Sequence, residues 1–424
     1  MTVTVAAEAL DLKSLVKPGD QIIWGQATGE PLTLTEALVA QRAGLGGVSV
    51  FLGSGFSDTL QPEHADHIRF RGMGGIGTHR RLAKRGVLEI VPCHVGQIGR
   101  YIDEGTIRCD VAFVQVSPAN AKGQHSYGVI NDYIQSAVRR ARVVVAEVND
   151  QVPWTHGEGH LPRERIDVLI ETSRPVVEVR SQPVGAVERA IAGFAAAYIE
   201  DGTTLQMGIG AIPDAILQCV GDRRDLGLHS GMVSDAVVDL VERGVLTNAA
   251  KPFDQGVSVA GSLIGTKRLY TFAHLNPAIA LKPSNFTHGD AVLGCIPKLV
   301  AINAAIEVDL TGQVNAEQVG GEYVGGVGGQ ADYVRAGHRS PGGRSIIALP
   351  ATARGGSVSR IVHRFDGGVT SSRSDADVVV TEFGAADLRA QPLAERARRM
   401  IAIAHPDFRE ALERTAHELL RRGF

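Results

Sequence analysis

Continuous apolar runs that alternate with helix-like segments constrain the fold of this chain more than any other feature. The runs Gln21–Gly25, Val48–Leu52, Val111–Val116 and Val143–Glu147 are typical of strands that are buried on both faces. Segments with a helical pattern, such as Leu34–Arg42, lie between them. This alternation predicts an α/β protein whose mainly parallel sheets are covered by helices.

The alternation is interrupted once, by the turn-rich segment 180–186. A strong helical pattern follows over 187–199, and strand-like runs resume at Thr203–Met207. The chain has 424 residues, which is enough for two or three domains. We therefore predict two tandem α/β domains, residues 1–186 and 187–424, with the chemistry in the second.

Several classes of function are disfavoured. The formal net charge is -3, so no general attraction to nucleic acid is expected. The longest apolar stretch, Ala190–Ile199, is too short to span a bilayer, so we expect no membrane partner. The N-terminus lacks a secretory pattern and the cysteines form no CxxC pair, which together predict a cytoplasmic protein.

Two motifs resemble binding sites but fit them poorly. Gly72–Gly77 matches G-x-G-x-x-G, yet a short run with His and Arg precedes it, whereas a dinucleotide site follows a buried apolar strand. A turn or a substrate-lining loop is the better interpretation, and a nicotinamide-dependent oxidoreductase is the competing hypothesis. His156 and His160 have the spacing of zinc ligands on a helix, but Gly157, Gly159 and the preceding Pro153 favour a polar loop. We expect no metal.

A glycine turn after the run Thr203–Met207 is a stronger candidate. The turn Gly208–Ile212 leads into a helical pattern with Pro213 near its first position. Backbone N–H groups at such a helix start can stabilise a phosphate or a developing oxyanion. An ordinary strand–helix turn explains the same residues equally well.

Two later segments also carry ligand-binding signals. Gly325–Gly329 has four glycines in five residues, which suits either a backbone that lies against a bulky ligand or a flexible hairpin. Arg354 follows the strand-like run Ser345–Leu349, where an arginine can hold phosphate or carboxylate, or can be a solvated loop cation.

These pieces occur in an order that resembles the acetyl-CoA hydrolase/transferase family. The similar segments run through most of the chain and include residues 25–31, 148–153, 201–217, 225–240, 326–335, 342–353 and 401–410. The resemblance implies two tandem CoA-transferase-type domains. It also implies acyl-CoA as substrate, a carboxylic acid as acceptor, no permanently bound cofactor and a homo-oligomer.

The resemblance also implies roles for single residues. The turn formed by Gly208, Ile209, Gly210, Ala211 and Ile212 lies on the CoA thioester and forms its oxyanion site. Gly328 and Gly329 line the CoA site, and Arg354 stands where relatives usually carry a lysine on the CoA side. Asn285 and Glu382 match polar positions near the active site. For the acyl pocket we expect contributions from residues 53–58 and 72–77.

One position departs from the family pattern in a way that affects the chemistry. Relatives read roughly H-[ST]-E-M-x-S-D-G, whereas this chain reads His229-Ser230-Gly231-Met232-Val233-Ser234-Asp235-Ala236. In the family mechanism the glutamate carboxylate attacks the thioester, and a glutamyl-CoA thioester follows. Gly231 has no side chain, so this covalent route cannot use position 231.

Three hypotheses follow from Gly231. The protein could hydrolyse acyl-CoA, or cleave or transfer an acyl group, with water or an external nucleophile in the vacated space. Glu322 could substitute as the carboxylate in a CoA-transferase, although a surface glutamate explains it as well. The chain could also be a non-catalytic CoA-binding protein.

Overall fold

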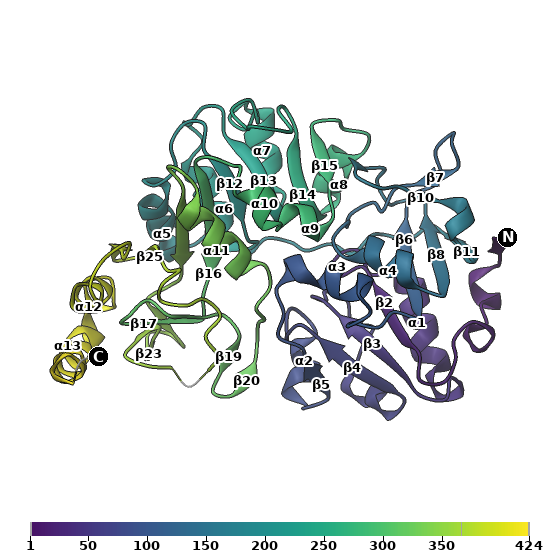
Figure 1. Cartoon of the computed structure of the whole chain (residues 1–424), viewed down its shortest axis with the longest axis horizontal. Helices are drawn as coiled ribbons and strands as arrows, with labels where there is room; N and C mark the ends of the chain where they lie inside the picture. Colours follow the sequence, from purple (N-terminus) through teal and green to yellow (C-terminus); the bar gives the residue numbers. More distant parts are fainter. Residues whose placement is uncertain (1, 366, 423–424) are drawn as a thin grey trace.

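Two large sheets form the framework of the protein (Figure 1). The structure is a computed structural model and describes residues 2–365 and 367–422. Within these residues the first sheet has eight strands in the order β1-β11-β8-β6-β2-β3-β4-β5, and all neighbouring strands run parallel. The strands are β1 (Val3–Thr4), β2 (Gln21–Trp24), β3 (Val48–Leu52), β4 (Ile68–Gly72), β5 (Leu88–Ile90), β6 (Val111–Val116), β8 (Val143–Asn149) and β11 (Val168–Thr172).

Both faces of this first sheet are buried. In β2, Ile22 belongs to one hydrophobic cluster and Ile23 to another, because successive strand residues point to opposite faces. Helix α1 packs on the first cluster, and α3 and α4 pack on the second. The helices of this half are α1 (Leu32–Gln41), α2 (Arg80–Lys84), α3 (Val95–Asp103) and α4 (Ile134–Arg140).

The second sheet has nine strands among the described residues, in the order β26-β25-β21-β16-β12-β13-β14-β15-β9. Only the pair β25 and β26 is antiparallel in this set. The strands are β9 (His156–Gly157), β12 (Thr204–Met207), β13 (Gly227–Val233), β14 (Ser258–Leu263), β15 (Ile279–Leu281), β16 (Leu299–Ala304), β21 (Arg344–Ala348), β25 (Val378–Thr381) and β26 (Gly384–Asp387).

Helices and short sheets complete the second half. The helices are α5 (Ala186–Ala196), α6 (Ala211–Cys219), α7 (Ala236–Glu242), α8 (Lys267–Ala273), α9 (Ser284–Thr287), α10 (Asp290–Leu293), α11 (Gln330–Arg339), α12 (Leu393–Ala402) and α13 (Pro406–Arg421). Short sheets join β17 (Glu307–Asp309) to β18 (Val314–Asn315) and β24 (Ile361–Val362), β19 (Gln318–Val319) to β20 (Glu322–Tyr323), and β22 (Thr352–Ala353) to β23 (Val358–Ser359). In the first half, β7 (Gln124–His125) pairs with β10 (Leu161–Pro162).

The two halves interlock at several points. Strand β9 comes from the first half of the chain but forms the edge of the second sheet, where His156 pairs with Ala280. The backbone amide of Asn131 donates to the backbone carbonyl of Gly261 at 2.8 Å. From the other side, the β19–β20 hairpin extends toward α2 (Figure 1). These contacts fix the sheets relative to each other.

The predicted fold class is confirmed. The expected runs appear as β2, β3, β6, β8 and β12, and the helical pattern over 187–199 appears as α5. Among the described strands of the two large sheets, the one departure from parallel pairing is the edge strand β26, and the short sheets contain further antiparallel pairs. A domain division after residue 186 stays a prediction.

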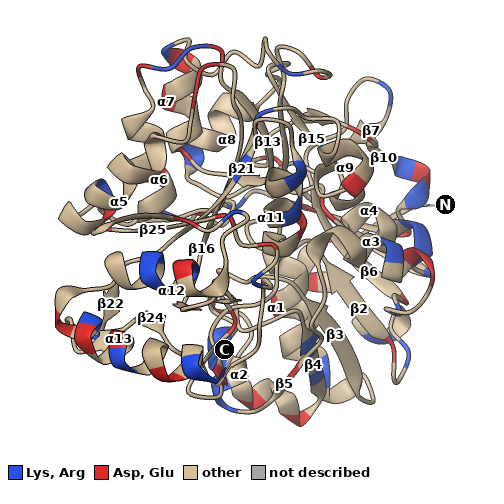
Figure 2. Ribbon diagram, turned by 60° about the vertical axis from the view of Figure 1, so that its left-hand side comes forward, with Lys and Arg blue, Asp and Glu red and all other residues tan. Residues whose placement is uncertain are grey.

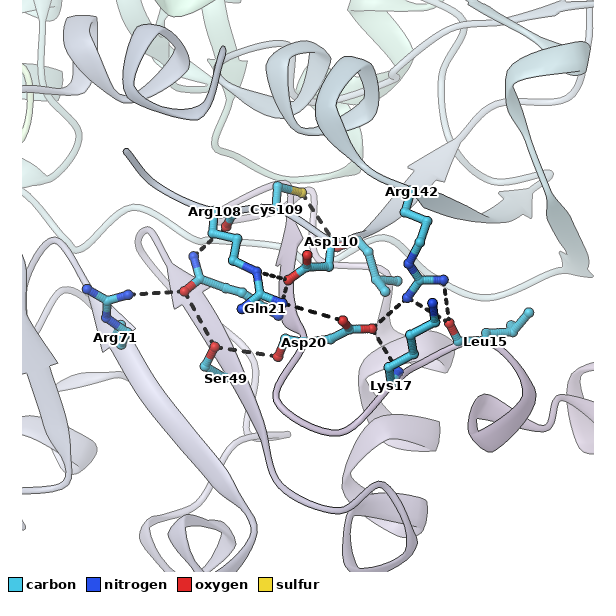
Figure 3. A network of polar contacts seen from close by, with 11 residues as sticks. Leu15, Lys17, Asp20, Gln21, Ser49, Arg71, Arg108, Cys109, Asp110 and Arg142 are labelled. Atoms are coloured by element: carbon cyan, nitrogen blue, oxygen red, sulfur yellow. Dashed lines mark hydrogen bonds and ion pairs between the residues drawn. The ribbon is translucent and has the colours of Figure 1, made fainter. Parts of the chain in front are cut away.

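A polar network at the amino end of β2 holds the start of this strand in place (Figure 3). One carboxylate oxygen of Asp20 accepts from Arg142 at 2.7 Å and from the backbone amide of Lys17 at 2.8 Å. The carboxylate of Asp110 accepts from the backbone amide of Gln21 at 2.8 Å. Segments from three parts of the chain are joined in this way at the amino ends of neighbouring strands.

Charged residues lie mainly on outer helices and loops (Figure 2). Strands β6, β13 and β16 carry none, whereas α13 carries both signs along its length. No described helix combines the length and the apolar character needed to cross a membrane.

Candidate active site

A cavity of about 180 Å³ lies between the two halves of the chain, and both sheets point the carboxyl ends of their strands toward it. In parallel α/β sheets, ligands bind at this edge. From the first half it is lined by Gln26, Ser54, Phe56, Met73, Ile76, Val95 and Asp132. From the second half it is lined by Gln206, Met207, Gly208, Ile209, Gly231, Met232, Ser262, Ile264, His288, Asn303, Gly328, Gly329, Gln330 and Tyr333.

The predicted oxyanion turn borders this cavity with its first two residues. Gly208 and Ile209 are lining residues and directly follow the end of β12 at Met207. A Cβ built on Gly208 would meet nothing within 4 Å, so a ligand can approach the backbone here. Gly210, Ala211 and Ile212 lie outside the lining and form the start of α6, where Gly210 has φ +119°.

Position 231 lacks a side chain, and its side-chain space is filled. A Cβ on Gly231 would lie 2.7 Å from both Cε1 and Nε2 of His288, which is closer than real Cβ contacts. The backbone of Gly231 is not in the left-handed region, so the restriction is one of space alone. A glutamate side chain at this position would therefore require the imidazole to move.

His288 is a buried histidine that the sequence analysis did not select. It directly follows the short helix α9, and its Nδ1 lies 2.9 Å from Thr287 Oγ1. Its ring is tilted against that of Tyr333 with centroids 4.7 Å apart. Burial, with a smaller contribution from His229, lowers the pKa of His288 to about 3. The imidazole is therefore neutral at physiological pH.

Asp132 supplies the only carboxylate among the cavity-lining residues that the structure describes. Gln26 Nε2 donates to Asp132 Oδ2 at 2.6 Å, while Gln26 Oε1 accepts from the Ser54 amide at 2.9 Å. The amide orientation of Gln26 is thus fixed from both ends. Burial raises the pKa of Asp132 to about 6, although the Gln26 hydrogen bond opposes this shift. Sequence reasoning missed Asp132 because no motif contains it.

The second glycine loop closes the cavity by contacting the first half. The amide of Gly75 donates to Gly325 O at 2.9 Å, and the amide of Val95 donates to Gly328 O at 3.0 Å. Gly328 and Gly329 line the cavity. A Cβ on Gly329 would overlap the His288 imidazole, so packing against protein explains this glycine.

The other predicted site residues lie away from the cavity lining. Glu322 is exposed in β20, on the hairpin that packs near α2, and it does not face the space beside Gly231. Arg354 is exposed in the turn between β22 and β23, and Asn285 is exposed in α9. The carboxylate of Glu382 accepts from the backbone amide of Ala351 at 2.8 Å. The roles expected for these residues stay predictions.

The two poorly fitting motifs have different outcomes: residues of Gly72–Gly77 line the cavity, whereas His156 and Gly157 lie in a strand and not in the expected polar loop. Met73 and Ile76, within Gly72–Gly77, line the cavity, as do Ser54 and Phe56 from the segment 53–58. The histidine pair does not lie on a helix, because His156 is in β9. Within the described ranges, no group of three or more His, Cys, Asp or Glu side chains could hold a metal ion.

A larger depression of about 610 Å³ lies elsewhere, between residues 150–153 and Lys267–His274. It contains none of the residues predicted for the site, and it lacks the convergence of strand ends seen at the smaller cavity. We therefore assign the chemistry to the smaller cavity.

Comparison with known proteins shows similarity along most of the chain. Residues 4–179 match the acetyl-CoA hydrolase/transferase N-terminal domain, and residues 265–416 match the C-terminal domain. The chain is 38% identical to 4-hydroxybutyrate coenzyme A transferase of Clostridium kluyveri, over 94% of each chain. It is 35% identical to succinyl-CoA:cyclohexane-1-carboxylate CoA transferase of Geobacter metallireducens, over 97% of this chain and 95% of the other.

A solved structure is also closely similar. RipA from Yersinia pestis superposes with a TM-score of 0.93 at 34% identity, covering 98% of this chain and 97% of its own. The similarity therefore extends over both sheets.

Proposed function

The chain belongs to the acetyl-CoA hydrolase/transferase family and is an enzyme of that type, and from this premise we propose that it hydrolyses an acyl-CoA thioester. Water attacks the thioester carbonyl in the place of the glutamate nucleophile of the family. The products are a free carboxylic acid and CoA thiol.

The observation that carries the proposal is the filled space beside Gly231. The imidazole of His288 occupies that space, so the cavity offers no side chain at 231, and one could be added only if the ring moved. A covalent glutamyl intermediate therefore has no attachment point there. The backbone at Gly208 and Ile209 still borders the cavity and can stabilise a tetrahedral oxyanion.

Asp132 is the group best placed to activate the water. Its pKa of about 6 leaves it largely ionised at neutral pH yet basic enough to accept a proton. The water oxygen bonds to the carbonyl carbon while its proton passes to Asp132. The C–S bond then breaks, and the CoA thiolate leaves and takes up a proton.

The cavity favours a small, mainly apolar acyl group. Its volume is about 180 Å³, and Phe56, Met73, Ile76 and Val95 supply apolar side chains to one side. The CoA moiety extends beyond this space toward the surface. We further propose that the enzyme is a cytoplasmic homo-oligomer and holds no permanent cofactor.

A CoA-transferase remains the second candidate, because Asp132 is a carboxylate inside the cavity. In that case Asp132 itself attacks the thioester, and a carboxylic acid acceptor completes the exchange. The two functions differ in whether free CoA appears without an acceptor.

The test uses short-chain acyl-CoAs with and without acetate, with free thiol and new thioesters measured separately. Hydrolysis predicts free CoA at a rate independent of acetate, with oxygen from isotopically labelled water in the released acid. Formation of acetyl-CoA without thiol release would instead establish the transferase and overturn hydrolysis. The variant Asp132→Asn should abolish either reaction, so the acetate dependence decides between them.

A further inference from the structure

The imidazole of His288 has one nitrogen engaged, while the other lies between Gly231 and Gly329, two residues that line the cavity. Nδ1 contacts Thr287 Oγ1 at 2.9 Å, whereas Nε2 has no hydrogen-bond partner among the described residues. The residue is only 7% exposed, yet it is one of those that line the cavity. A ring nitrogen that borders a cavity and has no protein partner is available to hydrogen-bond a bound ligand.

The hydrogen bonds around Thr287 decide which nitrogen carries the proton. The Thr287 hydroxyl can donate to His288 Nδ1 at 2.9 Å or to the Pro283 carbonyl at 3.4 Å. That carbonyl already accepts the amides of Phe286 and Thr287, at 2.9 and 3.0 Å. Both of its lone pairs are thus used, so the hydroxyl donates to Nδ1. The proton of the neutral imidazole then resides on Nε2.

The segment that carries His288 is held firmly. Tyr333 Oη donates to the Thr287 carbonyl at 2.8 Å, and His229 Nε2 contacts the same oxygen at 3.2 Å. The ring is also confined by Gly231 and Gly329, since a Cβ on either would overlap it. Two positions without side chains therefore leave room for an imidazole with one fixed orientation.

We propose that His288 is a catalytic residue whose Nε2–H donates a hydrogen bond to the carbonyl oxygen of the bound thioester. It acts together with the backbone at Gly208 and Ile209 on the oxygen that becomes an oxyanion. This inference rests on the proposed hydrolysis and deepens it, because it assigns the electrophilic side of the reaction. Water and Asp132 act on the carbon, and His288 acts on the oxygen.

The neutral state of His288 suits this role. Its pKa of about 3 means that the ring gains no proton at neutral pH and is a poor general base. A neutral imidazole still donates through its N–H and needs no reorganisation as charge develops. Burial therefore favours a hydrogen-bond donor over a proton acceptor at this position.

The first test separates the donor from the volume of the ring. His288→Phe keeps an aromatic ring without a donor, His288→Gln keeps an N–H at a similar reach, and His288→Ala removes both. We expect Ala and Phe to lower kcat about a hundredfold with little change in KM, as for loss of one oxyanion donor. His288→Gln should stay within about tenfold of the native enzyme. Equal kcat for Phe and Gln, with native-like circular dichroism in both, would overturn the proposal.

The second test does not require turnover. In protein with nitrogen-labelled histidine, long-range proton–nitrogen spectra should show the Nε2–H tautomer of His288. A ketone analogue of acyl-CoA, with a methylene group in place of sulfur, should move the Nε2 proton resonance downfield on binding. A proton on Nδ1, or no shift on saturation with the analogue, would refute the donor role. If the native enzyme hydrolyses nothing but the shift occurs, hydrolysis fails while the donor role stands.

Discussion

The imidazole of His288 occupies the space that a side chain at residue 231 would need: a Cβ on Gly231 would lie 2.7 Å from two ring atoms. Since the Gly231 backbone lies outside the left-handed region, the restriction on a side chain there is one of space. A side chain at 231 and the observed position of the His288 ring are therefore incompatible, and one of them must shift.

This exclusion predicts strong coupling between the two positions. Gly231→Glu should lower the free energy of unfolding by about 1 to 3 kcal/mol, the usual effect of overpacking. In the double variant Gly231→Glu/His288→Ala this loss should largely disappear, because the ring no longer blocks the new side chain. Urea denaturation of the four proteins measures the coupling, and additive single effects would contradict it.

Asp132 should set the acidic limb of the pH profile. Because burial raises its pKa to about 6 and it must be ionised to accept a proton, kcat/KM should rise with pH and level off above that value. Asp132→Asn should lower kcat about a hundredfold or more. A profile that is flat from pH 5 to 8, roughly the window around this pKa, would remove Asp132 from the mechanism.

Gln26 provides a matched control for that profile. Its hydrogen bond lowers the pKa of Asp132, so removing the donor with Gln26→Met should raise the pKa further. The inflection in kcat/KM should then move to higher pH while the plateau rate changes less. Movement to lower pH would contradict the hydrogen-bond geometry described above.

Asp332 in α11 should make stability depend on pH. Burial raises its pKa to about 7, against the hydrogen bond that it accepts from the Gly96 amide at 3.2 Å. A carboxyl group whose folded pKa is raised contributes stability at low pH that is lost as the pH rises through about 7. Asp332→Asn should therefore match the native protein near the unfolded pKa of about 4 and exceed it in stability above neutrality. Urea denaturation across this range checks the sign, and a constant difference would refute it.

The turn after β12 offers a pair of glycine variants with opposite outcomes. Gly210 has φ +119°, so Gly210→Ala should destabilise the protein by about 1 to 3 kcal/mol through backbone strain. Gly208 is not in that region and has open space around it, so Gly208→Ala should fold normally. It should still impair catalysis, because its methyl group enters the space where the thioester approaches. Equal thermal stability of both variants would count against this account of the turn.

The network in Figure 3 should contribute to stability without affecting catalysis. Asp20→Ala removes the acceptor of the Lys17 backbone amide and leaves Arg142 only the more distant Leu15 carbonyl, which should lower the free energy of unfolding by about 1 to 3 kcal/mol. At temperatures where the variant is folded, its kcat should equal that of the native enzyme, because the network lies outside the cavity.

Local patterns in the sequence determined much of the framework. Runs such as Val48–Leu52 appear as strands because burial on both faces requires continuous apolar residues, and this requirement is visible without the fold. The family motifs and the missing side chain at Gly231 were equally visible. Gly208 and Gly329 were selected by motif, and both line the cavity.

The remaining site residues depend on contacts between distant segments. Asp132 reaches the cavity from the first half, and His288 fills the space beside Gly231 from a separate helix–loop segment. Glu322, chosen for its closeness in sequence to the glycine loop, lies exposed on a hairpin instead. Periodicity reports which face of an element is buried, but not which side chains meet across an interface. Only the tertiary structure decided that an imidazole occupies the space beside Gly231, because that depends on how volume is shared between elements that are distant in the sequence.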